Sequence, residues 1–398
     1  MAQAPQRSNQ ATLSVAVSPF NKAFCSLAPF GPFVALLPVA RKDQRMNTSG
    51  FDNFDTIDEL LEHARCERDN GNTDEAASLL ETILDLTRRQ GDMGRETTTL
   101  FELASARLEM GAWSSAREIA SKGLDACRLI GHKAGEMAFH GLLGQLQRRL
   151  ENYEQALDHM LCGLELAQEC CALEREVVFY ADLANLSLVT GNSHTAAAQA
   201  DAGLRRACEL DNGEMRLAFI GIKAQSLRMR GETEAAQLLL EEGIRLAELE
   251  GSKDRASLFR HDLALLAQDL GNKEQAEELF RKVSDEFART GKNESLYRAQ
   301  QNLTSLLSSD GRSEEAAHSL AKELITASQL DKHVFQKAIL RMVSILEQMW
   351  TNKEHELLKE SISILQMTFV DSKEWANKFF AALASFDERL SVPMANES

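Results

Sequence analysis

Apolar residues follow helical spacing through the body of the chain. Between residues 97 and 110 they fall three or four positions apart, which predicts a helix from Thr97 to Met110. A second apolar stripe runs from Ala116 to Cys127 and stops before Gly131. Gly111 and Gly131 predict the ends of the two helices, since glycine adopts a positive φ at little cost. The unit predicted is two antiparallel helices joined by a tight turn.

This unit recurs along the sequence. Glycine stands at intervals of twenty residues, at Gly71, Gly91, Gly111, Gly131, Gly191, Gly231, Gly251, Gly271, Gly291 and Gly311. The vacant positions in this series include Glu151, Cys171 and Asp211. An alanine follows alternate positions by five residues, at Ala76, Ala116, Ala156, Ala196, Ala236, Ala276 and Ala316. A fixed period of forty residues predicts a stacked repeat.

Small residues occupy two further positions of the repeat. The first helices carry Ala64, Ala104, Gly144, Ala184, Ala224 and Ala264 at one position. The second helices carry Gly123, Gly163, Gly203 and Gly243 at another. Glycine inside a helix costs up to about 1 kcal/mol relative to alanine, so four at one position indicate a packing requirement. We expect the two helices of a unit to cross closely at these positions.

The combination of a turn glycine, an alanine five residues later and a small residue seven before the glycine resembles the tetratricopeptide repeat. The chain departs from the common form by being six residues longer per unit and by lacking its terminal proline. It is similar to the forty-residue variants in kinesin light chain and in bacterial signalling proteins. The resemblance implies an all-α, right-handed α-solenoid of antiparallel helix pairs over residues 46–370. Seven units are clear, and an eighth, at 337–370, is degenerate.

The two ends of the chain differ from the repeats. Residues 1–45 hold five of the six prolines and a net charge of +4. Three interpretations stay open for this segment: a disordered leader, a targeting peptide, or a mis-assigned start before Met46. Residues 371–390 predict an amphipathic helix that caps the solenoid, as terminal repeats require, although its aromatic side could instead dock a partner or a second copy. Residues 391–398 are expected to be a disordered tail.

Charge and cysteine content restrict the kinds of partner and the cellular location that the sequence favours. The formal net charge is −16, so residues 46–398 carry −20, which disfavours binding to nucleic acid or anionic lipid. No stretch reaches the roughly 20 apolar residues of a membrane span. The seven cysteines show no disulfide or zinc spacing, which favours a reduced, cytoplasmic location. Cys66 and Cys127 fall on small or apolar repeat positions and are expected to be buried.

Motifs for catalysis are missing from the sequence. We find no phosphate loop, dinucleotide-binding glycine motif or nucleophile elbow. The nine histidines do not pair at a spacing of four residues, as two metal ligands on one helix would. We therefore expect no cofactor, no metal site and no enzymatic activity.

The resemblance also implies a binding surface, because the first helices of tetratricopeptide stacks line a concave groove. Amide and hydroxyl side chains should face it at one level, at Ser105, Gln145, Asn185, Gln225 and Ser305. Arginines follow one turn later, at Arg68, Arg148 and Arg228, with Arg149 beside them. Gly141, Ala181 and Gly221 would leave a floor with little side-chain bulk.

One hypothesis assigns these residues to a partner. Gln145, Asn185 and Gln225 would bracket its extended backbone. Arg148, Arg149 and Arg228 would bind its carboxylates, since a guanidinium makes paired, charge-assisted hydrogen bonds, so an acidic partner is expected. The alternative is that these residues form an ordinary solvated polar face.

The function predicted from the sequence is that of a non-catalytic scaffold or adaptor that binds a protein or an extended peptide in the groove. The alternative is a sensory module of a bacterial-type signalling system, acting in trans on a transcription regulator or a cyclic-nucleotide enzyme. The sequence leaves the oligomeric state open.

Overall fold

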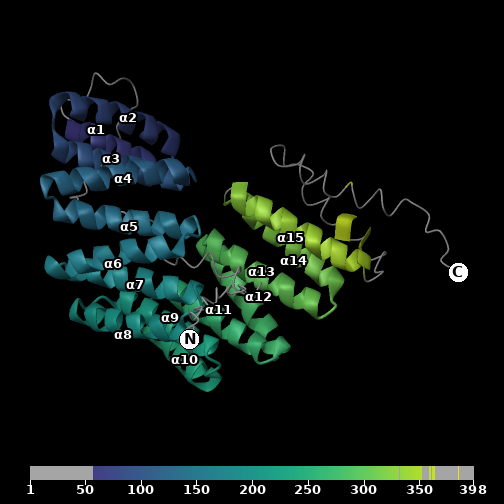
Figure 1. The fold of residues 1–398 in the computed structure, drawn as a ribbon. Coiled ribbons are helices and arrows are strands. Elements are labelled where there is room, and N and C mark those ends of the chain that lie inside the picture. Colours follow the sequence, from purple (N-terminus) through teal and green to yellow (C-terminus); the bar gives the residue numbers. More distant parts are fainter. Residues whose placement is uncertain (1–56, 331, 352–357, 360, 364–383, 385–398) are drawn as a thin grey trace, which may run out of the picture. The chain divides into compact units, whose positions relative to one another are not determined.

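The computed structural model describes residues 57–330, 332–351, 358–359, 361–363 and 384. Fifteen α-helices account for most of the described residues (Figure 1). They are α1 (Ile57–Asp69), α2 (Thr73–Gln90), α3 (Met93–Glu109), α4 (Trp113–Ile130), α5 (Lys133–Arg149), α6 (Tyr153–Glu169), α7 (Leu173–Val189), α8 (Ser193–Glu209), α9 (Gly213–Met229), α10 (Thr233–Leu249), α11 (Lys253–Asp269), α12 (Lys273–Thr290), α13 (Asn293–Ser309), α14 (Ser313–Ser328) and α15 (Lys332–Thr351). Odd-numbered helices are the first helices of the repeat, and even-numbered ones the second.

From residue 71 to residue 311, every turn of the twenty-residue series has the same backbone conformation. All ten glycines of the series have positive φ, and so do the three residues at vacant positions, Glu151, Cys171 and Asp211. At Gly131 (φ 68°) the backbone N–H donates to the carbonyl of Arg128, and the next N–H donates to that of Cys127. These bonds satisfy carbonyls that the helix end leaves open. The predicted helix ends are confirmed.

The predicted start of α3 at Thr97 is wrong. The helix begins four residues earlier, at Met93, because Asp92 caps it: the carboxylate accepts a hydrogen bond from the backbone N–H of Arg95 at 3.0 Å. Aspartate is among the preferred residues at this position, since its side chain satisfies an N–H that has no partner within the helix.

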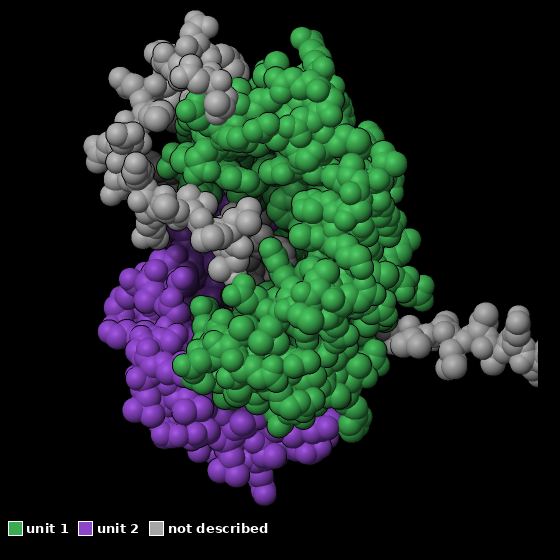
Figure 2. All heavy atoms as spheres, turned by 90° about the vertical axis from the view of Figure 1, so that its left-hand side faces the viewer, with its two compact units in different colours: residues 1–226 green, residues 227–398 purple. Residues whose placement is uncertain are grey.

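The described helices pack as an α-solenoid. The chain falls into two compact units, residues 1–226 and 227–398 (Figure 2), and each is described by itself. Within each unit the two helices of a pair lie side by side, and the second helix packs against the first helix of the next pair. The predicted all-α architecture of stacked antiparallel helix pairs is confirmed. The handedness of the superhelix and the domain limits stay predictions.

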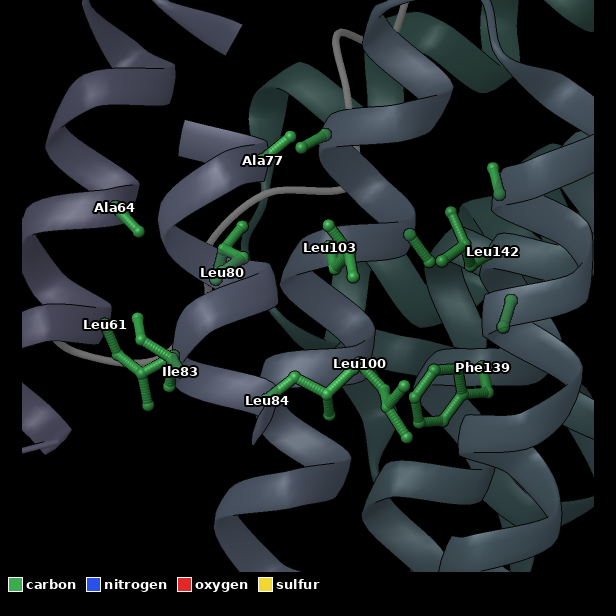
Figure 3. Packing of buried hydrophobic residues seen from close by; sticks show 14 of the residues in the cluster. Leu61, Ala64, Ala77, Leu80, Ile83, Leu84, Leu100, Leu103, Phe139 and Leu142 are labelled. Atoms are coloured by element: carbon green, nitrogen blue, oxygen red, sulfur yellow. The ribbon is translucent and has the colours of Figure 1, made fainter. Parts of the chain in front are cut away.

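The core lies between the helices as a series of buried apolar clusters. Figure 3 shows it at the start of the first unit, where Leu61, Leu80 and Leu100 from three successive helices belong to one buried cluster. Phe139 and Leu142 of α5 extend the same cluster. Because each helix buries residues against both of its neighbours, the pairs depend on one another for their core.

The four helix glycines have a different packing role from the one expected. A Cβ added to Gly163 of α6 would lie 2.2 Å from the ring of Phe179 on α7, so this glycine makes room for an aromatic ring of the next unit, not for its own partner helix. The same pairing occurs at Gly123–Phe139, Gly203–Phe219 and Gly243–Phe259. The close approach within one helix pair occurs at Gly144 of α5, where an added Cβ would lie 2.9 Å from Met160 of α6.

Two further expectations concern cysteine and the ends of the chain. Cys127 is buried, as expected, but Cys66 is exposed. The equivalent Ala106 and Leu146 lie on helices that pack against a preceding second helix, whereas α1 has no such neighbour among the described residues. Segments 1–45 and 391–398, and all of 371–390 except residue 384, lie outside the described residues. None of the described helices combines the length and the apolar character of a membrane span.

Candidate functional site on the first helices

The first helices α1 and α3 are joined by a buried charge cluster. Glu102 of α3 accepts a hydrogen bond from Arg65 Nε at 2.7 Å and from Arg68 Nη1 at 2.5 Å, one on each carboxylate oxygen. The Arg68 side chain is 4% exposed and also lies 3.7 Å from Glu109. Both oxygens of Glu102 are therefore paired, as a buried carboxylate requires.

The helices α5 and α7 carry a related cluster, which we call the Asp182 cluster: Gln145, Arg148 and Asp182. The three residues stand at the same separations as Arg65, Arg68 and Glu102 do, 37 and 34 residues. Gln145 hydrogen-bonds the carboxyl of Asp182, and Arg148 lies close enough to favour its charged form. Burial opposes both effects and is the largest of the three, and it raises the pKa of Asp182 to about 6.

Pairing in the Asp182 cluster is incomplete. Oδ2 of Asp182 is enclosed, yet it accepts no hydrogen bond from the described residues. Two differences from the first cluster account for this. Aspartate is one methylene shorter than glutamate, and the neutral amide of Gln145 stands where Arg65 brings a cation. A buried carboxylate oxygen without a donor is costly, so this position is a candidate for contact with another molecule.

Apolar contacts separate the two clusters. At the positions equivalent to Arg68 and Glu102, the α3–α5 contact carries Leu108 and Leu142, and Leu142 belongs to the core (Figure 3). In the next contact along, Leu188 and Ile222 occupy the same positions and are buried. Polar and apolar contacts thus alternate between successive first helices of the first unit, which doubles the period of this face there to eighty residues.

Parts of the eighty-residue pattern recur in the sequence beyond the two clusters. Gln225, Arg228 and Asp262 repeat the spacing of the Asp182 cluster in the sequence. A second set, Arg95, Arg175 and Arg255, recurs at the same interval near the start of α3, α7 and α11. Arg228 lies in the second unit, where its Nη1 is 2.6 Å from Asp269 Oδ2.

The structure places the six predicted site residues in different settings. Gln145 and Arg148 come together around Asp182. Asn185 lies three residues beyond Asp182 on α7 and is 6% exposed. Arg149, at the end of α5, is exposed. Gln225 is half-buried on α9, and Arg228 is paired with Asp269. Their role in binding a partner stays a prediction.

The carboxylates Glu102 and Asp182 were not among the candidate residues from the sequence. A signal for them exists, because an acid recurs 34 residues after Arg68, Arg148 and Arg228. A comparison of positions forty residues apart does not reveal this signal, because the repeats between these arginines carry Leu108 and Leu188 at the equivalent position.

The second unit has its own buried charge, between α13, α14 and α15. Arg341 Nη2 donates to the carbonyl of Gln301 at 2.7 Å and to Ser305 Oγ at 2.5 Å. Its Nε lies 3.3 Å from Glu323, which is 0% exposed. Burial raises the pKa of Glu323 to about 7. Ser305, one of the predicted polar positions, is thus engaged by the chain itself, and Glu323 has no surface to offer another molecule.

Comparisons with solved structures agree with the fold. The chain is similar to the apo form of RapI, with a TM-score of 0.56, 11% identity and coverage of 64% of this chain and 92% of that one. It is also similar to a tetratricopeptide repeat protein from Parabacteroides merdae ATCC 43184, with a TM-score of 0.51, 17% identity and coverage of 71% and 96%. No protein-family model matches the sequence, and no curated protein does. The fold is that of tetratricopeptide-repeat proteins.

Proposed function

We propose that the protein is a non-catalytic scaffold or adaptor that binds a protein or an extended peptide on the first helices of its first unit. The observation that carries this proposal is the Asp182 cluster, where a polar group on these helices lacks a hydrogen-bond donor. The equivalent Glu102 has both of its oxygens paired. A bound segment can supply the missing donor, because every peptide bond outside proline offers an N–H.

The surroundings of the cluster suit an extended chain. Gly141 and Ala181 adjoin it in sequence on α5 and α7 and add little bulk. Asn185 lies one turn from Asp182 and carries both a donor and an acceptor, as a peptide backbone needs, although only 6% of the residue is exposed in the free protein. Arg148 and Arg149 add positive charge at the end of α5.

Affinity capture with the full chain, with bound proteins identified by mass spectrometry, tests the proposal. One variant carries Arg148→Ala and Arg149→Ala on α5. A matched control carries Arg117→Ala and Lys122→Ala, which removes the same charge from exposed positions on the second helix α4. Circular dichroism confirms that both variants keep their helices.

We expect a partner that wild type and the α4 variant retain and the α5 variant loses. Retention by the α5 variant together with loss from the α4 variant would place binding on the second helices and contradict the proposal. The sensory alternative uses the same helices with a short peptide as ligand. It predicts no retained protein and a peptide-induced change in compactness, which small-angle scattering measures.

A further inference from the structure

Asp182 combines a strong requirement for a hydrogen-bond donor with partial access to solvent. The residue as a whole is half-buried, although its Oδ2 is enclosed. One oxygen lacks a partner among the described residues. The two oxygens of an aspartate exchange by rotation about the Cβ–Cγ bond, which has a broad, two-fold profile. A donor that reaches this half-buried residue can therefore complete the pairing of whichever oxygen it meets.

Without a bound ligand, asparagine at this position would give a more stable folded protein than aspartate. Asparagine has nearly the same shape, keeps one acceptor for Gln145 and has no charge to desolvate. A carboxylate that is costly in the free protein is useful when the bound state supplies a stronger interaction. Charge-assisted hydrogen bonds are roughly twice as strong as neutral ones, so a cationic donor gains most from meeting a carboxylate.

The charges of the chain favour a cation over an anion here. Arg148 already faces Asp182, and Arg228 is paired with Asp269, so neither guanidinium is free of an internal carboxylate. The whole chain carries a net charge of −16, and a field of that sign attracts positive ligands. This reverses the expectation of an acidic partner for the contact at Asp182 alone, whereas the exposed Arg149 stays the expected contact for an acidic group of the same segment.

We propose that Asp182 determines specificity by binding a lysine or arginine side chain of the bound segment. This inference rests on the proposed function, because it assigns one contact within the same binding surface. It commits to a basic residue of a peptide or protein segment. The Arg65–Arg68–Glu102 cluster, whose carboxylate is already saturated, makes no such contact.

Selection from a phage-displayed library of random 12-residue peptides tests the inference on the full chain. Three proteins are compared: wild type, Asp182→Asn, and the control Asp201→Asn. The control removes the same charge from α8, where Asp201 pairs with Lys223 at 2.8 Å. Thermal unfolding is measured for all three, to show that lost selection does not come from lost structure.

We expect wild type and Asp201→Asn to enrich peptides with lysine or arginine at one fixed position. Asp182→Asn should lose this preference, with about a tenfold weaker affinity for the enriched peptides, as expected for one charge-assisted bond. Its melting temperature should not fall below that of wild type.

The outcomes separate this inference from the proposed function. Equal preference for basic residues in wild type and Asp182→Asn would overturn the role of Asp182 and leave the peptide-binding function standing. Enrichment of acidic residues by wild type would likewise overturn it. No enrichment of any peptide by wild type would overturn the peptide-binding surface and the inference with it.

Discussion

At the scale of single residues, the side chain three positions before the recurring arginine decides whether both oxygens of the facing carboxylate are hydrogen-bonded. Glu102 receives two arginines, whereas Asp182 receives a glutamine and an arginine at the same spacings. The backbone arrangement is shared, so the difference in pairing comes from side-chain length and charge. The same position of the repeat can thus hold a fully paired carboxylate in one repeat and an incompletely paired one in another.

The cost of Asp182 predicts a stabilising substitution. Its pKa of about 6 exceeds the ordinary value of 3.8, so between these pH values the folded state holds a proton that the unfolded state has lost. Stability therefore falls as pH rises from about 4 to 6 and stays reduced above. Asp182→Asn should be more stable than wild type at pH 7 by up to about 3 kcal/mol, with the advantage vanishing near pH 4. Urea unfolding at several pH values measures this.

Glu102→Gln provides the opposite case. It leaves the buried Arg68 with only the more distant carboxylate of Glu109, 3.7 Å from its Nε, so it should destabilise the protein by about 3 kcal/mol at pH 7. If both substitutions shifted stability in the same direction, the contrast drawn here between a saturated and an unsaturated carboxylate would be wrong.

A histidine pair in the first unit predicts sensitivity to acid. Arg128 Nη2 lies 3.5 Å from His140 Nε2, and His140 Nδ1 lies 3.1 Å from His159 Nδ1. An arginine can only donate, so His140 accepts at Nε2 and donates from Nδ1, which requires both rings to be neutral. Burial, His159 and Arg128 lower the pKa of His140 to about 4.

Protonation must therefore oppose folding at His140. Below its ordinary pKa of 6.5 the unfolded state takes up a proton that the folded state refuses, so stability falls as pH drops from 6.5 to 4, by up to about 3 kcal/mol. His140→Asn should show a smaller decrease over this range in pH-dependent thermal unfolding. An unchanged pH profile in the variant would assign the acid sensitivity to other groups.

At the scale of helices, the contact between the second helix of one repeat and the first helix of the next, which we call the joint, keeps the summed size of its two facing side chains nearly constant. Four joints pair a glycine of the second helix with a phenylalanine sixteen residues later. Where the glycine position holds Val283, the residue sixteen later is Ala299, and both lie in one buried cluster. A small residue on one helix and a large one on the other fill the same space, in either order.

This complementarity predicts the outcome of an exchange. Gly163→Val alone should clash with Phe179 and cost about 1–3 kcal/mol, and Phe179→Ala alone should leave a cavity worth about 3–5 kcal/mol. The double variant recreates the valine–alanine joint, so its loss should be at least 2 kcal/mol smaller than the sum. A double-mutant cycle in urea measures the coupling. Additive losses would show that the two positions do not share one space.

The helices and the turns between them could be predicted from the sequence, whereas the contacts between successive first helices could not. Residues such as Gly131 impose their turns locally, so a single rule locates them. The glycine–phenylalanine joint was missed because it links adjacent repeats, whereas the glycines were interpreted within one repeat. Gln145, the hydrogen-bond partner of Asp182, lies 37 residues away on another first helix. A search for residues that recur every forty residues compares equivalent positions only, so it does not detect a contact between two different positions of the repeat.

At the scale of the whole chain, the eighty-residue alternation makes pairs of repeats unequal. Contacts α1–α3 and α5–α7 carry carboxylates, while the contact between α3 and α5 is apolar. A ligand that contacts the first helices of the first unit therefore meets a polar group at every second contact between them. This arrangement predicts that recognition is concentrated at the Asp182 cluster and is not spread evenly along the first helices.

Site-specific photo-crosslinking of the full chain tests the central claim most directly. A photoreactive amino acid replaces Arg149, exposed on the first helix α5, or Ser121, exposed on the second helix α4. The account predicts crosslinks to the captured partner from position 149, competed away by the enriched basic peptide, and none from position 121. Crosslinks from position 121 but not from 149 would contradict binding on the first helices.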